Sequence, residues 1–347
     1  MQKGISIIIC TYNGAKRLPQ TLQHIAQQQV PTDLQWELIV VDNNSNDETS
    51  AMVQAEWDKY PSAPRLILLH QPMPGVSYAR EKGLKAVTYS YVIICDDDNW
   101  LAPNYIETVI RILDNDKNIG IVGGWSTGKF EIEPPIWFNK FATAYAVGQR
   151  RKESAPIDWL ATAGVGIRKE ALDKLNKLNF EQILSGRQGK ILLAGDDLEL
   201  CAAIRAIGYK VYFSTELSFV HFMTAGRLNW QYFKRMVYNQ SSVQSVFGMY
   251  SIAYELLKEN KPASFKSVHK ILWGDILAPV KAKCKTFRKT LRFLKSLLLE
   301  KEGDSTGYLN RYYISYLKYL VLHKREMKKR YALIANFYDR IKSDGSL

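Results

Sequence analysis

The stretch "YVIICDDDNW", residues 91–100, runs from apolar residues directly into three consecutive carboxylates. Asp96, Asp97 and Asp98 repel one another, and apolar neighbours raise the free-energy cost of their charge. In an extended segment, Asp96 and Asp98 point to one side and Asp97 points away. Two carboxylates on one side suit a hard divalent cation such as Mg²⁺ or Mn²⁺. The alternative interpretation is a solvated acidic turn whose carboxylates cap the next helix.

Short strand-like segments alternate with helix-length segments around this stretch. The strand-like segments are residues 5–10, 36–41, 65–70 and 91–95, and the helix-like segments are residues 17–29, 47–60, 76–87 and 102–115. Near-continuous apolar strands that alternate with helices are typical of a parallel sheet covered on both faces. The sequence therefore predicts an α/β fold with a mostly parallel sheet.

Polar clusters follow three of these strands. They are "TYNG" at 11–14, "DNNSND" at 42–47 and "DDDN" at 96–99. Ligands of such sheets bind beyond the carboxyl ends of the strands. The clusters therefore predict a ligand site at that edge, and this position favours the metal interpretation of the acidic triplet.

The organisation of the chain changes after residue 115. Residues 116–225 are mixed, with strand signals at 119–124, 158–172 and 209–222 and a helix signal at 196–208. Residues 226–347 are mostly helical, aromatic and basic. We expect a first half at 1–115, a second half of the same domain at 116–225, and a helical basic region at 226–347.

Six blocks, in this order, resemble the inverting family-2 glycosyltransferases of the GT-A fold. The blocks are "SIIICTYNGAKRLPQTL", "ELIVVDNNSNDET", "GVSYAREKGLKA", "YVIICDDDNWLAPNYI", "GVGIRKEAL" and "LLAGDDLELCAAIRAIGYKVYF". The resemblance covers residues 4–225. It implies a Rossmann-like, mostly parallel sheet flanked by helices, with the C-terminal region as a helical extension. It also implies sugar transfer from a nucleotide-sugar donor to a glycan or lipid-linked acceptor, in bacterial cell-surface polysaccharide synthesis.

The resemblance assigns five residues to the donor in the 1–115 half. Thr11, Tyr12 and Asn13 would line the pocket of the nucleotide base. Asp42 would bind the base or ribose. Arg80 would lie close to the ribose or diphosphate.

The resemblance also implies a metal pair and a catalytic pair. Asp96 and Asp98 would form the D-x-D pair that binds Mn²⁺ or Mg²⁺ beside the donor, with Asp98 the surer ligand. Many relatives carry another acid at the position of Asn99. The catalytic Glu-Asp motif would be Asp196–Asp197, with Asp197 as the general base in the 116–225 half.

The chemistry of the proposed reaction needs these residue types. A sugar hydroxyl is a poor nucleophile, and an ionised carboxylate within hydrogen-bond reach can accept its proton during attack. The departing nucleoside diphosphate gains negative charge that a metal ion can stabilise. On spacing alone, Asp196 and Asp197 could equally be an acidic helix start. His221 is either a third metal ligand or a structural histidine.

Most of the positive charge lies near the C-terminus. Residues 281–347 hold 17 Lys and Arg against 6 Asp and Glu, so +11 of the net +13 lies there. Phe287, Leu291, Leu294 and Leu298 share one helical face, a pattern that suits a helix on an anionic membrane surface. The alternative is a helix whose apolar stripe packs on the enzyme or a second subunit. No nucleic-acid module accompanies this region, so nucleic acid is not an expected partner.

The N-terminus reads as a first strand rather than a secretion signal, and no apolar run reaches the roughly 18 residues of a spanning helix. We therefore expect a cytoplasmic protein, with peripheral contact to the inner face of the cytoplasmic membrane left open. Two other functions also remain open. One is a sugar-phosphate nucleotidyltransferase, although "TYNGAKR" matches its Gly-rich loop poorly. The other is a non-enzymatic protein that binds anionic membranes.

Overall fold

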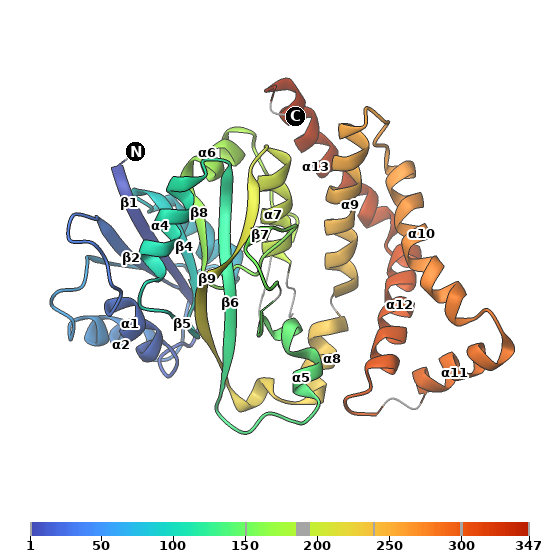
Figure 1. The fold of residues 1–347 in the computed structure, drawn as a ribbon, viewed down its shortest axis with the longest axis horizontal. Coiled ribbons are helices and arrows are strands. Elements are labelled where there is room, and N and C mark those ends of the chain that lie inside the picture. Colours follow the sequence, from blue (N-terminus) through green and yellow to red (C-terminus); the bar gives the residue numbers. More distant parts are fainter. Residues whose placement is uncertain (1, 150, 185–194, 239, 299–300, 346–347) are drawn as a thin grey trace.

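The computed structural model describes residues 2–149, 151–184, 195–238, 240–298 and 301–345. A nine-stranded sheet forms its centre, and a bundle of helices lies beside it (Figure 1). The strands are β1 (Gln2–Thr11), β2 (Trp36–Asp42), β3 (Leu66–His70), β4 (Tyr89–Asp96), β5 (Asn99–Leu101), β6 (Ile119–Phe130), β7 (Ala155–Pro156), β8 (Val165–Arg168) and β9 (Lys210–Met223). This architecture confirms the predicted α/β class.

Helices follow most of the strands and continue beyond the sheet. In the sheet region they are α1 (Leu18–Ala26), α2 (Thr49–Trp57), α3 (Val76–Lys85), α4 (Tyr105–Asn115), α5 (Phe138–Phe141), η1 (Ala142–Tyr145), α6 (Lys169–Lys177), α7 (Asp196–Ala206) and η2 (Ala225–Arg227). The helical region consists of α8 (Trp230–Tyr238), α9 (Gln240–Lys258), α10 (Phe265–Lys283), α11 (Phe287–Leu298), α12 (Ser305–Leu322) and α13 (Lys324–Ser343).

The strand order places the first four strands of the prediction together. The order is β3-β2-β1-β4-β8-β6-β9-β5, with β7 paired to β9. β1, β2, β3 and β4 are mutually parallel, whereas β8 runs antiparallel to both β4 and β6. The carboxyl ends of β1, β2 and β4 therefore meet at one edge, as the polar clusters predict.

Alternation along the central strands builds a core on each face of the sheet. Ile7 and Ile9 of β1 pack on the face covered by α1, α2 and α4. Ile8 packs on the opposite face, whose core continues through α6, α7 and α9 to α13. Successive side chains of a strand point to opposite faces, so a strand buried on both faces must be apolar throughout.

The predicted strand at 158–172 is only partly correct. β8 covers Val165–Arg168, and the chain then enters α6 at Lys169. Ala171, Leu172 and Leu175 are buried along α6, a helical spacing that outweighs the strand signal.

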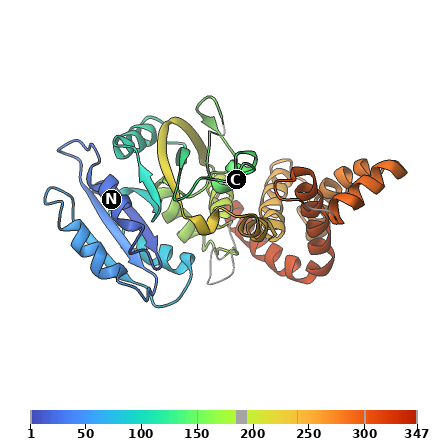
Figure 2. The same ribbon diagram turned by 90° about the horizontal axis from the view of Figure 1, so that it is seen from below.

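The helical region packs on the sheet domain through α9 and α13. α9 contacts α7, and α13 contacts α9. The C-terminal end of α13 returns to α6, where Arg340 Nη2 donates to the Asn179 carbonyl oxygen at 2.8 Å. Figure 2 shows this region beside the sheet domain. No helix within the described ranges is both long and apolar enough to cross a membrane.

Candidate active site

Strand register brings the predicted donor-binding residues to one edge of the sheet. Thr11 at the end of β1 lies beside Asp42 at the end of β2. Cys10 on β1 lies beside Asp96 at the end of β4. Because these strands are parallel, their polar ends form a continuous row.

Asp42 is a buried carboxylate held by short polar contacts. Its Oδ1 accepts from the Ser45 backbone N–H at 2.9 Å, and its Oδ2 accepts from Ser50 Oγ at 2.5 Å. Burial opposes ionisation, but these hydrogen bonds outweigh it and lower the pKa of Asp42. Asp42 therefore stays ionised, which suits an acceptor of hydroxyl or amide protons from a nucleoside.

The last residue of β1 and the two residues after it differ in their surroundings. Thr11 is buried, and its Oγ1 donates to Asp97 Oδ2 at 2.6 Å. The Tyr12 side chain is 54% exposed, so it offers an open aromatic face. Asn13 has φ of +51°, and its Oδ1 accepts from the Asn46 backbone N–H at 3.0 Å. The β1 and β2 loops are thus tied together.

The acidic triplet does not continue as an extended strand. β4 ends at Asp96, and Asp97 and Asp98 form a turn into β5. The prediction that Asp96 and Asp98 point to one side assumed an extended segment, and that assumption was wrong. The chain turns because β5 pairs with β9, where Asn99 lies opposite His221.

Asp97 and Asp98 form ion pairs with arginines. Asp97 Oδ2 lies 2.7 Å from Arg17 Nη2, and Asp98 Oδ2 lies 2.6 Å from Arg227 Nη1. Burial of the Arg227 guanidinium opposes its charge, yet the Asp98 carboxylate more than offsets this and raises the pKa of Arg227. In this structure, therefore, arginine side chains offset the repulsion between the acids.

The Arg80 side chain of α3 contacts the start of α7. Its side chain is buried and pairs with Asp196, and Nη2 donates to Thr162 Oγ1 at 3.3 Å. Burial opposes the charge of Arg80, but the carboxylates of Asp196 and Asp96 together raise its pKa. Arg80 is thus the cation between the end of β4 and the predicted catalytic pair.

The two acids of the catalytic pair have different environments. Asp196 is buried and forms an ion pair with Arg80. Asp197 is half-buried at the first turn of α7, and its Oδ1 accepts from the Leu198 backbone N–H at 2.8 Å. Negative charge at a helix start is stabilised by the helix dipole. The position of the two acids at the start of α7 is therefore compatible with both interpretations, the acidic helix start and the catalytic pair.

His221 lies beside the aspartate turn. Its Nε2 lies 3.7 Å from Asp98 Oδ1 and 3.4 Å from Arg227 Nη1. Its Nδ1 is buried and finds no hydrogen-bond partner among the described residues. The adjacent Asn99 is fully buried, and neither polar atom of its side chain has a described partner. Buried polar atoms are normally paired, so this corner holds unmet hydrogen-bonding capacity.

A sequence model of glycosyl transferase family 2 matches residues 6–175, which include β1 to β8 and the aspartate turn. Residues 6–175 belong to glycosyl transferase family 2. The match ends before Asp196, Asp197 and His221 of the candidate site.

Known proteins of similar sequence match this chain over short segments. Chondroitin synthase of Escherichia coli is 31% identical over 122 residues, which are 35% of this chain and 17% of that protein. The poly(ribitol-phosphate) beta-N-acetylglucosaminyltransferase TarP of Staphylococcus aureus is 28% identical over 147 residues, 42% of this chain and 43% of that protein. The chain thus spans less than half the length of these relatives.

Solved structures of similar fold extend over the helical region as well. TarS of S. aureus in complex with UDP-GlcNAc has a TM-score of 0.53 at 17% identity and covers 98% of this chain and 91% of its own. The mannosyltransferase PcManGT of Pyrobaculum calidifontis, in complex with GDP-Man and Mn²⁺, has a TM-score of 0.55 at 17% identity and covers 93% of this chain and 88% of its own. At these identities the likeness concerns the fold.

Three residues of the candidate site suit a hard cation by type. Asp96, Asp98 and His221 offer carboxylate oxygens and an imidazole nitrogen, which Mn²⁺ accepts. The unpaired Nδ1 of His221 shows that its ring is not fully engaged by described residues. However, no three His, Cys, Asp or Glu side chains of the described part converge as a ready metal site. Arg227 holds Asp98 instead, so a cation and this guanidinium would share one carboxylate.

Three residues of the candidate site were not predicted from the sequence. Arg17 and Arg227 face the aspartate turn, and Glu199 supports the start of α7. Glu199 is fully buried and accepts from the Leu184 backbone N–H at 2.7 Å and from Tyr250 Oη at 3.0 Å. For Glu199, the only signal in the sequence was its place as the fourth residue of "DDLE". No neighbouring residue indicates that Arg17 or Arg227 belongs to the site.

Proposed function

We propose that the chain is a metal-dependent, inverting glycosyltransferase. It moves a sugar from a nucleotide-sugar donor to a hydroxyl of a glycan or lipid-linked acceptor, in cell-surface polysaccharide synthesis. The observation that carries this proposal is the meeting of three groups at one edge of a family 2 domain. These groups are the polar ends of β1 and β2, the Asp96–Asp98 turn, and the acids that begin α7.

The chain's own residues would perform separate tasks in this reaction. Thr11, Tyr12, Asn13 and Asp42 bind the nucleoside, where the ionised Asp42 accepts protons and the exposed Tyr12 ring stacks on the base. Arg80 lies at the diphosphate side and keeps Asp196 neutralised.

Asp197 would act as the general base. It accepts the proton of the acceptor hydroxyl while that oxygen bonds to the anomeric carbon. The bond from this carbon to the diphosphate oxygen breaks with its electron pair, and the nucleoside diphosphate leaves. A single displacement inverts the configuration at the anomeric carbon. Asp196, occupied by Arg80, is a positioning residue for Asp197.

A divalent cation would be held by Asp96 and Asp98, with His221 as a third ligand. When bound, Mn²⁺ or Mg²⁺ supplies positive charge that stabilises the departing diphosphate. Of these three ligands, Asp98 also pairs with Arg227.

The regions of the chain would divide the work. We assign donor binding to 1–115, acceptor binding and catalysis to 116–225, and peripheral contact with an anionic membrane to 226–347. In α11, Leu291 is 56% exposed and Leu294 is 49% exposed, so these two side chains do not pack on the enzyme. The side chains of Phe287 and Leu298 lie outside the described ones.

A sedimentation assay with vesicles that contain phosphatidylglycerol tests this membrane contact. The wild-type chain should pellet with the vesicles, whereas the L291S/L294S variant should stay in the supernatant. Equal sedimentation of both would refute this contact.

The decisive experiment measures release of nucleoside diphosphate. A panel of UDP- and GDP-sugars is incubated with candidate acceptors, with Mn²⁺ or with chelator, and the product anomer is assigned by NMR. We expect metal-dependent release that Asp98→Ala abolishes and that Asp173→Ala, an exposed acid on α6, preserves. Metal-dependent turnover that survives Asp98→Ala contradicts the proposed site. Pyrophosphate release from a nucleoside triphosphate and a sugar phosphate would instead identify a nucleotidyltransferase.

A further inference from the structure

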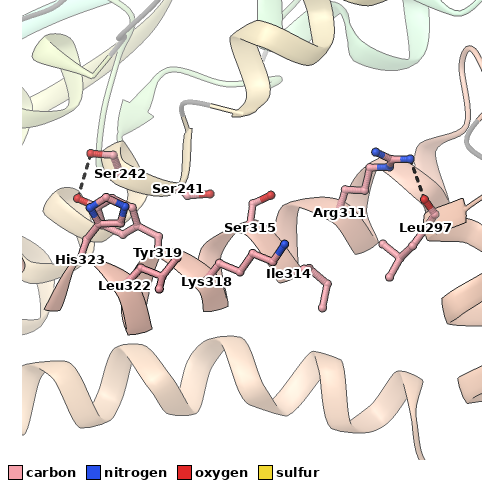
Figure 3. A pocket seen from close by; sticks show the side chains of 10 residues that line it. All are labelled: Ser241, Ser242, Leu297, Arg311, Ile314, Ser315, Lys318, Tyr319, Leu322 and His323. Carbon is pink, nitrogen blue, oxygen red and sulfur yellow. Dashed lines mark hydrogen bonds between the residues drawn. The ribbon is translucent and has the colours of Figure 1, made fainter.

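The helical region contains a cavity of about 520 Å³ between α9, α11 and α12 (Figure 3). Ser241 and Ser242 of α9 line one side and Leu297 of α11 lines one end. The rest of the lining comes from one face of α12 and from His323. This volume lies within the range of ligand-binding sites and exceeds the needs of a single water or inorganic ion.

The cavity is positively charged along α12. Arg311 and Lys318 both line it, at the helical spacing that places them on one face. No carboxylate of a described residue pairs with Lys318, and the described lining contains no Asp or Glu. Glu326 lies 3.1 Å from Nδ1 of His323, a lining residue, and also pairs with Arg330 at 2.6 Å. The cavity therefore favours an anion.

Ser241 provides an independent sign of a missing ligand. Its side chain is 4% exposed, yet its Oγ has no hydrogen-bond partner among the described residues. The neighbouring Ser242, by contrast, donates to Tyr319 Oη and accepts from Arg330 Nη1 at 2.8 Å. A buried hydroxyl without a partner costs free energy that a bound acceptor oxygen would recover.

Apolar side chains complete the lining. Ile314 and Leu322 of α12 lie on the same face as Lys318, and Leu322 is 74% exposed. Inorganic phosphate would leave these side chains without a partner. A phosphate that carries hydrocarbon chains would use both the cationic and the apolar side chains.

We propose that this cavity binds the phosphate headgroup of an anionic membrane phospholipid, with Lys318 and Ser241 on the phosphate and Leu322 against the chains. The inference deepens the membrane contact proposed above and is independent of sugar transfer. The site anchors the helical region by one specific lipid, in addition to any non-specific attraction of its basic surface.

The test uses soluble lipid and the full chain, without donor or acceptor. Isothermal titration calorimetry measures binding of dihexanoyl-phosphatidylglycerol below its micellar concentration. Comparison ligands are dihexanoyl-phosphatidylcholine, inorganic phosphate and farnesyl phosphate. We expect binding of phosphatidylglycerol and at least tenfold weaker binding of the other three.

Variants separate the cavity from general charge. Lys318→Ala should weaken phosphatidylglycerol binding about tenfold, since one charge-assisted contact is lost. Lys328→Ala, which removes an equal charge from an exposed position on α13, should leave it unchanged. Ser241→Ala should weaken binding severalfold while the unliganded Tm stays equal or rises, because the hydroxyl has no partner to lose.

Four results would overturn the proposal. The first is that phosphatidylglycerol does not bind, and the second is that the two lysine variants weaken its binding equally. The third is a Ser241→Ala variant with a lowered Tm and unchanged binding. The fourth is that phosphate or farnesyl phosphate binds more tightly than phosphatidylglycerol. Donor binding, measured on the same variants, should not change. A failure of the lipid site therefore leaves the glycosyltransferase proposal standing.

Discussion

At the scale of single residues, the aspartate turn depends on arginines from distant segments. Asp98 is 8% exposed, and the Arg227 guanidinium lies 2.6 Å from its Oδ2. The sequence position of Arg227, 129 residues away, gives no hint of this pairing.

Arg227→Gln tests the sharing of Asp98 between arginine and metal. Removing one partner of a buried ion pair typically costs about 3 kcal/mol, so the Tm without metal should fall. Mn²⁺ should then bind more tightly than in the wild type, because it no longer competes with the guanidinium. Electron paramagnetic resonance measures the concentration of free Mn²⁺ during a titration and so gives the Kd. Arg17→Gln is the matched control, since it removes the arginine of Asp97 only. Weaker Mn²⁺ binding in Arg227→Gln than in that control would exclude the competition.

Asp197→Asn tests the general base. The amide keeps the shape of the side chain but cannot accept the acceptor proton, so kcat should fall by about 10²- to 10⁴-fold. Donor affinity, measured by calorimetry, should be preserved. Glu170→Gln, at the matching first turn of α6, should retain full activity. Asp197→Asn with near-normal kcat would assign the base elsewhere.

Glu199 predicts a pH dependence of stability. Burial raises the pKa of Glu199 from 4.5 to about 7, against the hydrogen bonds it accepts. The folded chain therefore binds this proton more tightly than the unfolded chain does. Protonation of Glu199 therefore contributes to the free energy of unfolding below pH 4.5. This contribution, about 3 kcal/mol at most, is lost as the pH rises to about 7.

The Glu199→Gln variant isolates this effect. Gln is neutral throughout, so its free energy of unfolding should vary less between pH 5 and 7.5 than that of the wild type. Urea unfolding at several pH values measures the difference. Parallel pH profiles for the two proteins would show that Glu199 does not titrate in this range.

At the scale of elements, β6 and β9 approach closely at a register shift. A Cβ at Gly124 would lie 1.7 Å from the Leu217 carbonyl oxygen, so the backbone would have to move. Gly124→Ala should destabilise the fold by about 3 kcal/mol. Gly274→Ala, inside α10 with open space around it, should stabilise by about 0.5–1 kcal/mol. Thermal unfolding compares them, and equal Tm values would contradict the close approach.

Elements whose signal is local could be predicted from the sequence. The apolar runs of β1 to β4 and the helices between them lie where residues 1–115 indicated, and so does the polar edge. The turn at Asp97–Asp98 and the short β5 could not be predicted, because they exist only through pairing with β9. The same holds for the ion pairs of the site, although the family resemblance assigned Arg80 to it. Arg17, Arg80 and Arg227 meet the acids through tertiary contacts that no local spacing encodes.

At the scale of the whole molecule, one core joins the sheet domain to the helical region. This core runs from Ile8 of β1 through Cys201 of α7 and Met249 of α9 to Phe337 of α13. Buried side chains that pack together across both regions couple their unfolding.

We therefore expect a single unfolding transition. Differential scanning calorimetry should give one peak whose calorimetric and van't Hoff enthalpies agree. A chain truncated after residue 225 should lose solubility, since the outer face of α7 would be exposed. Two resolved peaks, or a stable truncated fragment, would show that the helical region folds independently.

The packing at Gly195 constrains how chimeric enzymes of this type can be engineered. Gly195 has φ of +124°, and a Cβ there would lie 2.4 Å from Val243 Cγ1 of α9, immediately before the two acids of α7. α9 therefore limits where the backbone of Gly195 can lie at the start of α7. Exchanging the C-terminal helices for those of another transferase would remove Val243 from this contact, so a successful graft must carry its own α7 with it.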